Sequence, residues 1–188
     1  MAAPTTSADF DRAYRSPITV WGDLRIPSEV RDLVRDRARQ SALELGCGVG
    51  RLSRYMTQQG LRVTGVDFSP VAIARARTRV ATDDLRPEFC VGDVTRLEAL
   101  NSIFDVALDV GCFHCLDAQG QRSYALELSR LLKPSGTHLI WAMDDTPSKM
   151  QLSPVAVREI FAPSFSVQHI HQSRRRLTRS HWYRLVRN

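Results

Sequence analysis

The segment LELGCGVGRL, residues 43–52, holds the residue types best suited to binding a small molecule. Gly46, Gly48 and Gly50 follow a short apolar run, and apolar residues at helical spacing follow them. Glycine tolerates positive φ and lets a ligand approach the backbone, while the free N–H groups of a helix start can face a polar ligand. The segment therefore predicts a ligand-binding turn between a buried strand and a helix. A glycine-rich turn without a ligand is the alternative, because such motifs are weak alone.

The glycine spacing argues against a nicotinamide cofactor. The dinucleotide fingerprint is G-x-G-x-x-G, and here the third glycine comes one residue early. Glu44 would face a pyrophosphate unfavourably, but its carboxylate suits an ammonium group, directly or through water. S-adenosylmethionine carries such an amine and no phosphate, so the segment favours it over NAD.

Asp67 is the second candidate ligand-binding residue. It ends the next predicted strand, about 20 residues past the glycines, where Rossmann-like units place the acid that accepts from ribose hydroxyls. Ser69 and Pro70 have the types preferred at an N-cap and first helical position. Asp67 could also help to cap that helix, but Ser69 serves that purpose.

The elements that must position these residues alternate between strand and helix from residue 41 to about 161. Further strands are predicted at 87–94, ending near Asp93, at 104–111 and at 137–143, with a helix over 121–132 that KPSG, residues 133–136, stops. An earlier helix, capped by Ser28, should turn Val30, Leu33 and Val34 to the sheet. Polar residues gather after the strands, at the edge where open α/β sheets bind ligands.

Five motifs in this order resemble those of class I S-adenosylmethionine-dependent methyltransferases. They cover about residues 41–143, and the flanking segments are similar to the small thiopurine- and tellurite-type enzymes. The motifs are LELGCGVGRL, VTGVDFSP, FCVGDVTRL, FDVALDVGCFH and LSRLLKPSGTHLI.

The resemblance implies a doubly wound α/β, Rossmann-like fold, with a mainly parallel seven-stranded sheet and helices on both faces. Residues 1–188 would form a single domain. Within it, residues 1–37 would supply an N-terminal lid and the helix leading into the core of residues 38–188.

The resemblance also implies the cofactor-binding residues. The glycines would lie under the methionine part of S-adenosylmethionine, Asp67 would hold the ribose, Phe68 and Val94 would cover the adenine, and Asp93 would accept from its amino group. The full set is Trp21, Glu44, Gly46, Cys47, Gly48, Gly50, Arg51, Asp67, Phe68, Ser69, Asp93, Val94, Asp109, Val110 and Gly111.

His114 is the candidate catalytic residue, since it follows the fourth strand near the expected sulfonium. A neutral imidazole there could take a proton from an acceptor O–H or N–H, or it could simply line the pocket wall. The sequence DVGCFHCLD differs from the Asn/Asp-Pro-Pro type that acts on nucleic acids and glutamine, which points to a small-molecule acceptor bearing O, N or S. The predicted substrate pocket contains Tyr14, Trp21, Phe113, His114, Trp141 and Met143.

The net charge of +6 is confined to the end of the chain. Residues 173–188 hold six arginines and no acids, and the other residues hold 20 basic and 20 acidic side chains. A turn and edge strand there would use arginine to resist edge pairing. Binding of RNA phosphates or attraction of an anionic small substrate are the alternatives, with nucleic acid the less favoured partner.

Composition sets the remaining expectations. No 18-residue apolar run and no signal-peptide core is present, so we expect no membrane association and a cytoplasmic location. Cys112 and Cys115 lack the second pair that a structural zinc site needs, so no metal is expected. The other functions considered are a nucleic-acid or protein methyltransferase, a cofactor-binding cyclase or regulator, and an NAD oxidoreductase. The sequence leaves the acceptor and the oligomeric state open.

Overall fold

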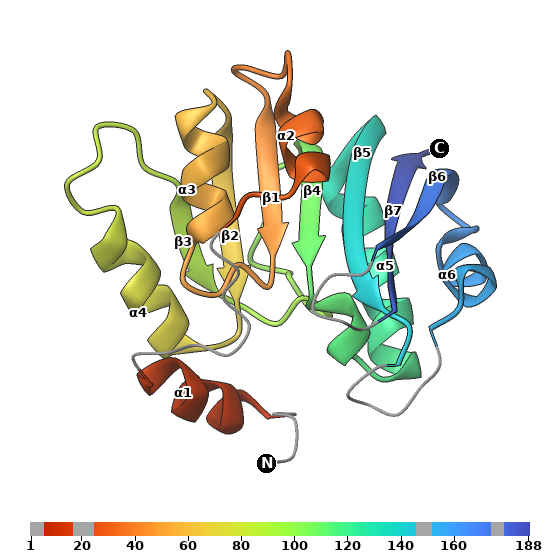
Figure 1. The fold of residues 1–188 in the computed structure, drawn as a ribbon, viewed down its shortest axis with the longest axis horizontal. Helices are drawn as coiled ribbons and strands as arrows, with labels where there is room; N and C mark the ends of the chain where they lie inside the picture. Colours follow the sequence, from red (N-terminus) through yellow and green to blue (C-terminus); the bar gives the residue numbers. More distant parts are fainter. Residues whose placement is uncertain (1–5, 17–24, 146–151, 174–178) are drawn as a thin grey trace.

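The computed structural model describes residues 6–16, 25–145, 152–173 and 179–188. Its seven-stranded sheet has the order β3-β2-β1-β4-β5-β7-β6 (Figure 1). Strands β1 to β5 pair in parallel, and β7 runs antiparallel to both β5 and β6. The predicted fold class is thus confirmed. The strands are β1 Ser41–Leu45, β2 Arg62–Asp67, β3 Glu88–Val91, β4 Phe104–Val110, β5 Leu132–Met143, β6 Phe165–Ser173 and β7 Ser180–Arg187.

Helices cover both faces of the sheet, and one crosses its carboxyl edge (Figure 1). On one face lie α2 (Ser28–Val34), α3 (Arg51–Gln58) and α4 (Pro70–Arg79), and on the other lie α5 (Ala118–Leu131) and α6 (Pro154–Phe161). Helix α1 (Ser7–Arg15) lies against α4 below the ends of the parallel strands. No helix among the described residues is long and apolar enough to cross a membrane.

Buried side chains on each face explain why these segments fold as they do. On the α2 and α3 face, the predicted residues Val30, Leu33 and Val34 pack with Met56 and Trp182. On the other face, the apolar stripe of α5 packs with α6 and the inner residues of the central strands. Burial of apolar surface on both faces is the main driving force for folding of the sheet.

Two predicted helix boundaries need correction. Helix α2 begins at Ser28 itself, with Pro27 at the N-cap position, and the Ser28 hydroxyl donates to Glu29. Helix α5 begins at Ala118, because the Asp117 carboxylate accepts from the Gly120 N–H, so the helix starts earlier than residue 121.

The predicted KPSG stop also takes another form. Helix α5 ends at Leu131 as expected, but β5 begins at Leu132 and runs through residues 133–136. Ser135 has φ of +62°, and the pairing register of β5 with β4 shifts between Phe104 and Val106. Strand β4 pairs with Leu132 and next with Thr137, so residues 133–136 bulge out between these two pairs at the start of β5.

The last strand is not an edge strand, which corrects the prediction from its arginines. Strand β7 lies between β5 and β6, and Trp182 and Tyr183 are buried on opposite faces. Strand β6 takes the edge instead, with His169 and Gln172 exposed. Alternation of side chains along β7 had indicated two faces, but only sheet pairing decides which strand stands outermost.

Candidate active site

The glycine loop links β1 to α3 and requires glycine for two reasons. Gly46, Gly48 and Gly50 have φ of +67°, +55° and +74°, a region that disfavours other L-residues. A Cβ atom at Gly46 would lie 2.5 Å from the Cβ of Cys112, which follows β4. The loop thus packs directly against the segment after β4, and a side chain at Gly46 would separate the two.

Asp67 fixes the glycine loop from the end of β2. Its Oδ2 accepts from the Gly48 N–H at 2.8 Å and its Oδ1 accepts from the Ser69 N–H at 2.9 Å. The side chain is buried, which raises the pKa of Asp67. Each oxygen keeps a second lone pair, so the carboxylate can accept hydroxyl groups of a ligand while holding the loop.

Glu44 lies beneath the same loop and is almost inaccessible to solvent. It accepts a hydrogen bond from the Ser53 hydroxyl of α3. Burial raises the pKa of Glu44 to about 7, and the nearby carboxylate of Asp67 adds to this, while Arg51 opposes it. A ligand ammonium group would stabilise the charged form of such a carboxyl. Arg51 itself donates to the carbonyl of Arg25, so its head group faces the N-terminal segment.

The predicted adenine side lies past β2 and β3. Phe68 is 36% exposed and meets the ring of Phe10 edge-on at 5.1 Å between centroids. Val94 is buried, whereas Asp93 is exposed and its Oδ1 accepts from the Thr95 N–H at 2.8 Å. These residues therefore line one end of the sheet edge, as the motif order predicts, with one Asp93 oxygen engaged by the local turn.

Helix α1 covers the glycine-loop end of the sheet edge, which revises the place of Tyr14. A Cβ atom at Gly48 would lie 2.8 Å from the Tyr14 hydroxyl, and Tyr14 is buried. Ser69 donates to the Asp11 carboxylate, and Arg75 of α4 donates to the carbonyls of Tyr14 and Ser16. Tyr14 thus contacts the glycine loop. Trp21, predicted for both the cofactor and substrate sites, lies outside the described residues.

At the end of β4, Asp109 serves as an internal anchor. Its carboxylate accepts from the N–H groups of Cys112 at 2.8 Å and Phe113 at 2.9 Å, and from the Tyr124 hydroxyl at 3.0 Å. Complete burial raises the pKa of Asp109 to about 6. These bonds hold the 3-10 turn Phe113–Cys115 below the sheet edge. Gly111, with φ of +101°, and the half-buried Val110 form the backbone that a ligand would meet here.

His114 projects from this turn and is bonded to the neighbouring strand. Its Nδ1 accepts from the Met143 N–H at 3.3 Å, and its ring lies edge-on to Trp141 at 5.7 Å. Burial lowers the pKa of His114 to about 4, so the ring is neutral near pH 7. Since Nδ1 accepts, the proton of the neutral ring lies on Nε2. His114 therefore presents a donor, which favours the pocket-wall role over the general base.

Two predicted pocket residues belong to the core instead. Phe113 is fully buried and packs against Tyr124 and Phe161, with centroids 5.2 and 5.3 Å away. Trp141 is buried and its Nε1 donates to the Ser180 hydroxyl at 3.2 Å. Met143, at the end of β5, is partly exposed. The sequence predicted aromatic residues at this edge correctly but could not tell which way each side chain turns.

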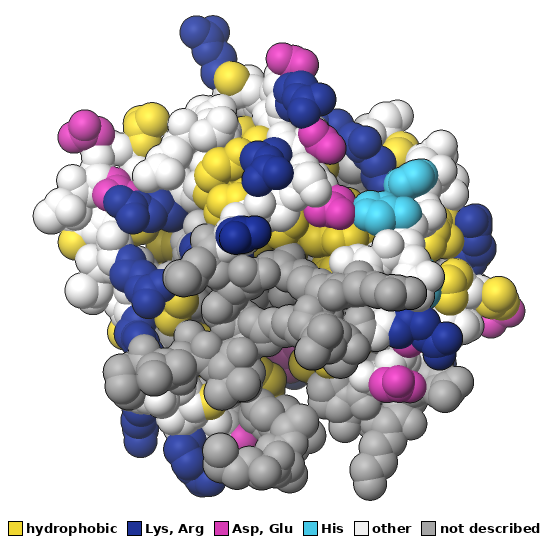
Figure 2. Space-filling view, in the orientation of Figure 1, with side chains coloured by type: hydrophobic (Ala, Val, Ile, Leu, Met, Phe, Trp, Pro, Cys, Tyr) yellow, Lys and Arg dark blue, Asp and Glu magenta, His cyan; other side chains and the backbone are white. Residues whose placement is uncertain are grey.

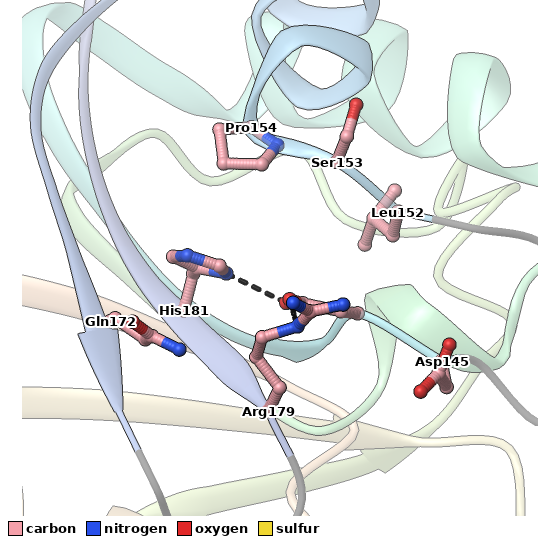
Figure 3. A pocket seen from close by; sticks show the side chains of 8 residues that line it. Asp145, Leu152, Ser153, Pro154, Gln172, Arg179 and His181 are labelled. Carbon is pink, nitrogen blue, oxygen red and sulfur yellow. Dashed lines mark hydrogen bonds and ion pairs between the residues drawn. The ribbon is translucent and has the colours of Figure 1, made fainter.

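The structure adds a hollow that the sequence interpretation missed (Figure 3). It has a volume of about 330 Å³ and lies where β5 ends and β7 begins. Asp144, Arg179 and His181 line it, with Leu152 and Pro154 from the segment that starts α6. Asp144 bonds both His181 and Arg179. The only sequence signal was an acidic pair after a strand, because the partners lie more than 30 residues further along the chain.

The cysteines show no sign of a metal centre. All four are free, and Cys47 and Cys112 lie by the glycine loop, where burial raises the pKa of both thiols. Within the described ranges, no group of three or more His, Cys, Asp or Glu side chains could hold a metal ion.

Comparison with known proteins identifies the family. Residues 42–136 match the methyltransferase domain family. A 2-heptyl-1-hydroxyquinolin-4(1H)-one methyltransferase from Mycobacteroides abscessus is 22% identical over 79% of this chain and 68% of its own length.

Two solved structures share the fold. The N-methyltransferase NodS from Bradyrhizobium japonicum, in complex with S-adenosylhomocysteine, has a TM-score of 0.82 at 18% identity, covering 98% of this chain and 99% of NodS. A TehB-like S-adenosylmethionine-dependent methyltransferase from Corynebacterium glutamicum has a TM-score of 0.76 at 17% identity, covering 97% of this chain and 98% of that one.

The family match spans half of the chain, and it confirms the class that the five motifs predicted. The chain belongs to the methyltransferase domain family, and it is a class I S-adenosylmethionine-dependent methyltransferase. An NAD oxidoreductase is thereby set aside.

Proposed function

We propose that this protein transfers a methyl group from S-adenosylmethionine to a small-molecule acceptor. The observation that carries the proposal is the pair of buried carboxyl groups at the glycine loop. Burial raises the pKa of both groups, and the carboxylate of Asp67 adds to the cost of ionising Glu44; a ligand with an ammonium group and hydroxyl donors would relieve that cost. S-adenosylmethionine has both features.

Different residues around the loop would hold different parts of the donor. Glu44 would face the ammonium group, Asp67 would accept from the ribose hydroxyls, and exposed Phe68 would lie against the adenine ring. S-adenosylmethionine, when bound, supplies a methyl carbon activated by its sulfonium. The protein then mainly has to align the acceptor and exclude water, and α1 over the loop supports the second task.

Support for a small-molecule acceptor comes from the hollow beside the predicted donor site. Its volume of about 330 Å³ suits a compact organic molecule. The relative from Mycobacteroides abscessus is named for a quinolone acceptor. The acceptor edge of this chain also keeps DVGCFH, residues 109–114, in place of the Asn/Asp-Pro-Pro type.

Nucleic acid is the weaker candidate partner, because two of the three arginines described in residues 179–188 have local roles. Arg179 pairs with Asp144, and Arg187 donates to the carbonyl of Leu132. In Figure 2 the described Lys and Arg side chains are spread over the visible face, with acidic side chains among them. A basic patch that tracks phosphates would gather them on one face.

Calorimetric titration tests the proposal. S-adenosylhomocysteine and S-adenosylmethionine should bind and NAD should not. Asp67→Ala should weaken binding by about 1–3 kcal/mol, because the ribose hydroxyls lose a charged acceptor. Asp83→Ala, which removes the partly exposed carboxylate paired with Arg54, is the matched control and should leave affinity unchanged. Tight NAD binding, or equal affinity in the Asp67→Ala variant, would contradict the proposal.

A further inference from the structure

The hollow at the end of β5 contains a carboxylate–imidazole pair. The Asp144 Oδ1 lies 2.6 Å from the Nδ1 of His181, and its Oδ2 lies 3.0 Å from the Nε of Arg179. Both members of the pair keep some access to the hollow, with 15% of the Asp144 side chain and 14% of the His181 side chain exposed. Figure 3 shows His181 and Arg179 on one side of the hollow and Leu152, Ser153 and Pro154 on the other.

Main-chain bonds fix the carboxylate in place. The Asp144 N–H donates to the Arg179 carbonyl at 3.0 Å, and the Leu152 N–H donates to the Asp144 carbonyl at 2.9 Å. The ring of His181 packs beside that of Tyr183, with centroids 5.9 Å apart. The pair is therefore held by the sheet itself and not by a side-chain contact alone, which is the arrangement that an oriented catalytic group needs.

The hydrogen bond to Asp144 decides which nitrogen of His181 can react. In the neutral ring Nδ1 carries the proton and donates it to the carboxylate, so Nε2 has a free lone pair. His114 has the opposite tautomer, because its Nδ1 accepts from Met143. The two histidines thus differ in chemistry: Nε2 of His114 can donate a hydrogen bond, whereas Nε2 of His181 can accept a proton.

The pair lies one residue to either side of the rung that carries the His114 contact. Met143 bonds His114 and pairs with Ser180, Asp144 follows Met143 at the end of β5, and His181 pairs with Ala142 one rung back in the sheet. The carboxyl ends of β4 and β5 lie side by side, since Asp109 and Val110 pair with Ile140 and Trp141. The hollow therefore adjoins the edge at which the donor methyl group is expected.

We propose that the hollow is the acceptor subsite and that His181 is the general base, with Asp144 as its positioning residue. This inference rests on the proposed function. The acceptor is a hydroxyl or amine compound, whose proton passes to Nε2 of His181. The acceptor lone pair forms the new bond to the methyl carbon as the carbon–sulfur bond breaks, and sulfur keeps that electron pair. His181 then returns the proton to solvent.

The chemistry of the hollow narrows the acceptor class. A thiol has a small thiolate fraction near neutral pH that is highly nucleophilic, so it gains less from a base than alcohols, weakly acidic phenols and amines, which keep their proton. The charge of Asp144 is balanced by Arg179, and Asp145 adds a second carboxylate to the lining. Among the described residues this balance disfavours an anionic acceptor, while Leu152 and Pro154 suit an apolar carbon body.

Methylation of ring-substituted phenols of graded acidity, benzylamine and benzyl thiol tests the inference, with S-adenosylhomocysteine formation as the readout. His181→Gln should lower turnover by roughly 10²–10⁴-fold on weakly acidic phenols. The loss should shrink for nitrophenols that are already ionised. Asp144→Asn should show the same trend with a smaller loss, since it acts through His181. His169→Gln, which removes an exposed imidazole from the edge strand outside the hollow, is the matched control.

Affinity for S-adenosylhomocysteine distinguishes a failure of this inference from a failure of the proposed function. It should be unchanged in every variant, which also reports that each variant is folded. An equal loss on ionised and neutral phenols, an equal loss in His169→Gln, or methylation of the thiol alone would overturn the inference. So would the absence of turnover on all hydroxyl and amine probes while the product still binds. If the wild-type protein binds neither S-adenosylmethionine nor its product, the proposed function itself is wrong.

Discussion

The two halves of the carboxyl edge position their polar side chains by different means. In the half where the donor is proposed to bind (the donor half), at the ends of β1 to β3, part of the order is local: Asp67 bonds the Ser69 N–H, and Asp93 bonds the Thr95 N–H. The second bond of Asp67, to the Gly48 N–H, spans 19 residues. In the acceptor half, at the ends of β4, β5 and β7, His114 bonds Met143 across 29 residues. The Asp144–His181 contact spans 37 residues.

This difference decides how each half depends on the rest of the chain. A turn whose hydrogen bonds join near neighbours is specified by its own short motif, so its geometry depends little on the rest of the sheet. A contact between distant strands depends on sheet pairing and can change when a loop or register changes. We infer that the backbone turns of the proposed cofactor site are encoded locally in this chain, whereas the side-chain contacts of the proposed acceptor site depend on the assembled sheet.

The largest effect on the donor half should come from adding a side chain to the glycine loop. Gly46→Ala should lower the free energy of unfolding by about 2–5 kcal/mol, because of the left-handed φ and the overlap with Cys112. Gly60→Ala is the matched control, because Gly60 has φ of +90° but the new Cβ would lie 3.3 Å from Ala38. It should cost about 1–2 kcal/mol. Urea unfolding and titration with S-adenosylhomocysteine measure both variants. An equal loss of stability in the two would show that the contact of Gly46 with the acceptor half is unimportant.

A smaller effect is expected from the charge that the donor half buries. Burial raises the Glu44 pKa from 4.5 to about 7, so folding favours the protonated form. Stability should therefore fall as pH rises from 4.5 through 7. Glu44→Gln keeps an acceptor for Ser53 and should remove this fall, which makes the variant more stable above pH 7 by up to about 3 kcal/mol.

Urea unfolding of both proteins between pH 4.5 and 8 measures this difference. The two stability curves should meet near pH 4.5 and separate as pH rises. The same variant should bind S-adenosylhomocysteine more weakly, because the ammonium group loses its counter-charge. Parallel stability curves would show that Glu44 does not titrate in this range, and unchanged affinity would remove it from the cofactor site.

The smallest effect should come from the acceptor half at His114. Because His114 is a donor with a pKa of about 4, it adds no acid limb to the rate between pH 5.5 and 8. His114→Gln keeps a donor and should raise the KM of the acceptor by about tenfold or less, with little change in turnover. Steady-state kinetics decide this, and a turnover reduced by roughly 10²–10⁴-fold at constant KM would restore the general-base role.

The sequence by itself determined the backbone turns of the donor half and the order of the elements. Positive φ at Gly46, Gly48 and Gly50 and the Asp67 position are properties of short contiguous segments, whose residue types restrict the local backbone. The apolar periodicity likewise indicated alternating strands and helices, and the family match confirms the class that the motifs predicted.

Only the tertiary structure decided where the acceptor-side residues point. Phe113 and Trp141 turned into the core, Tyr14 came to lie over Gly48, and β7 was placed inside the sheet. Asp144 and His181 meet because β5 and β7 pair antiparallel in one register. A shift of one residue would turn His181 to the other face. Such pairings depend on the packing energy of the whole sheet, which no short segment of the sequence contains.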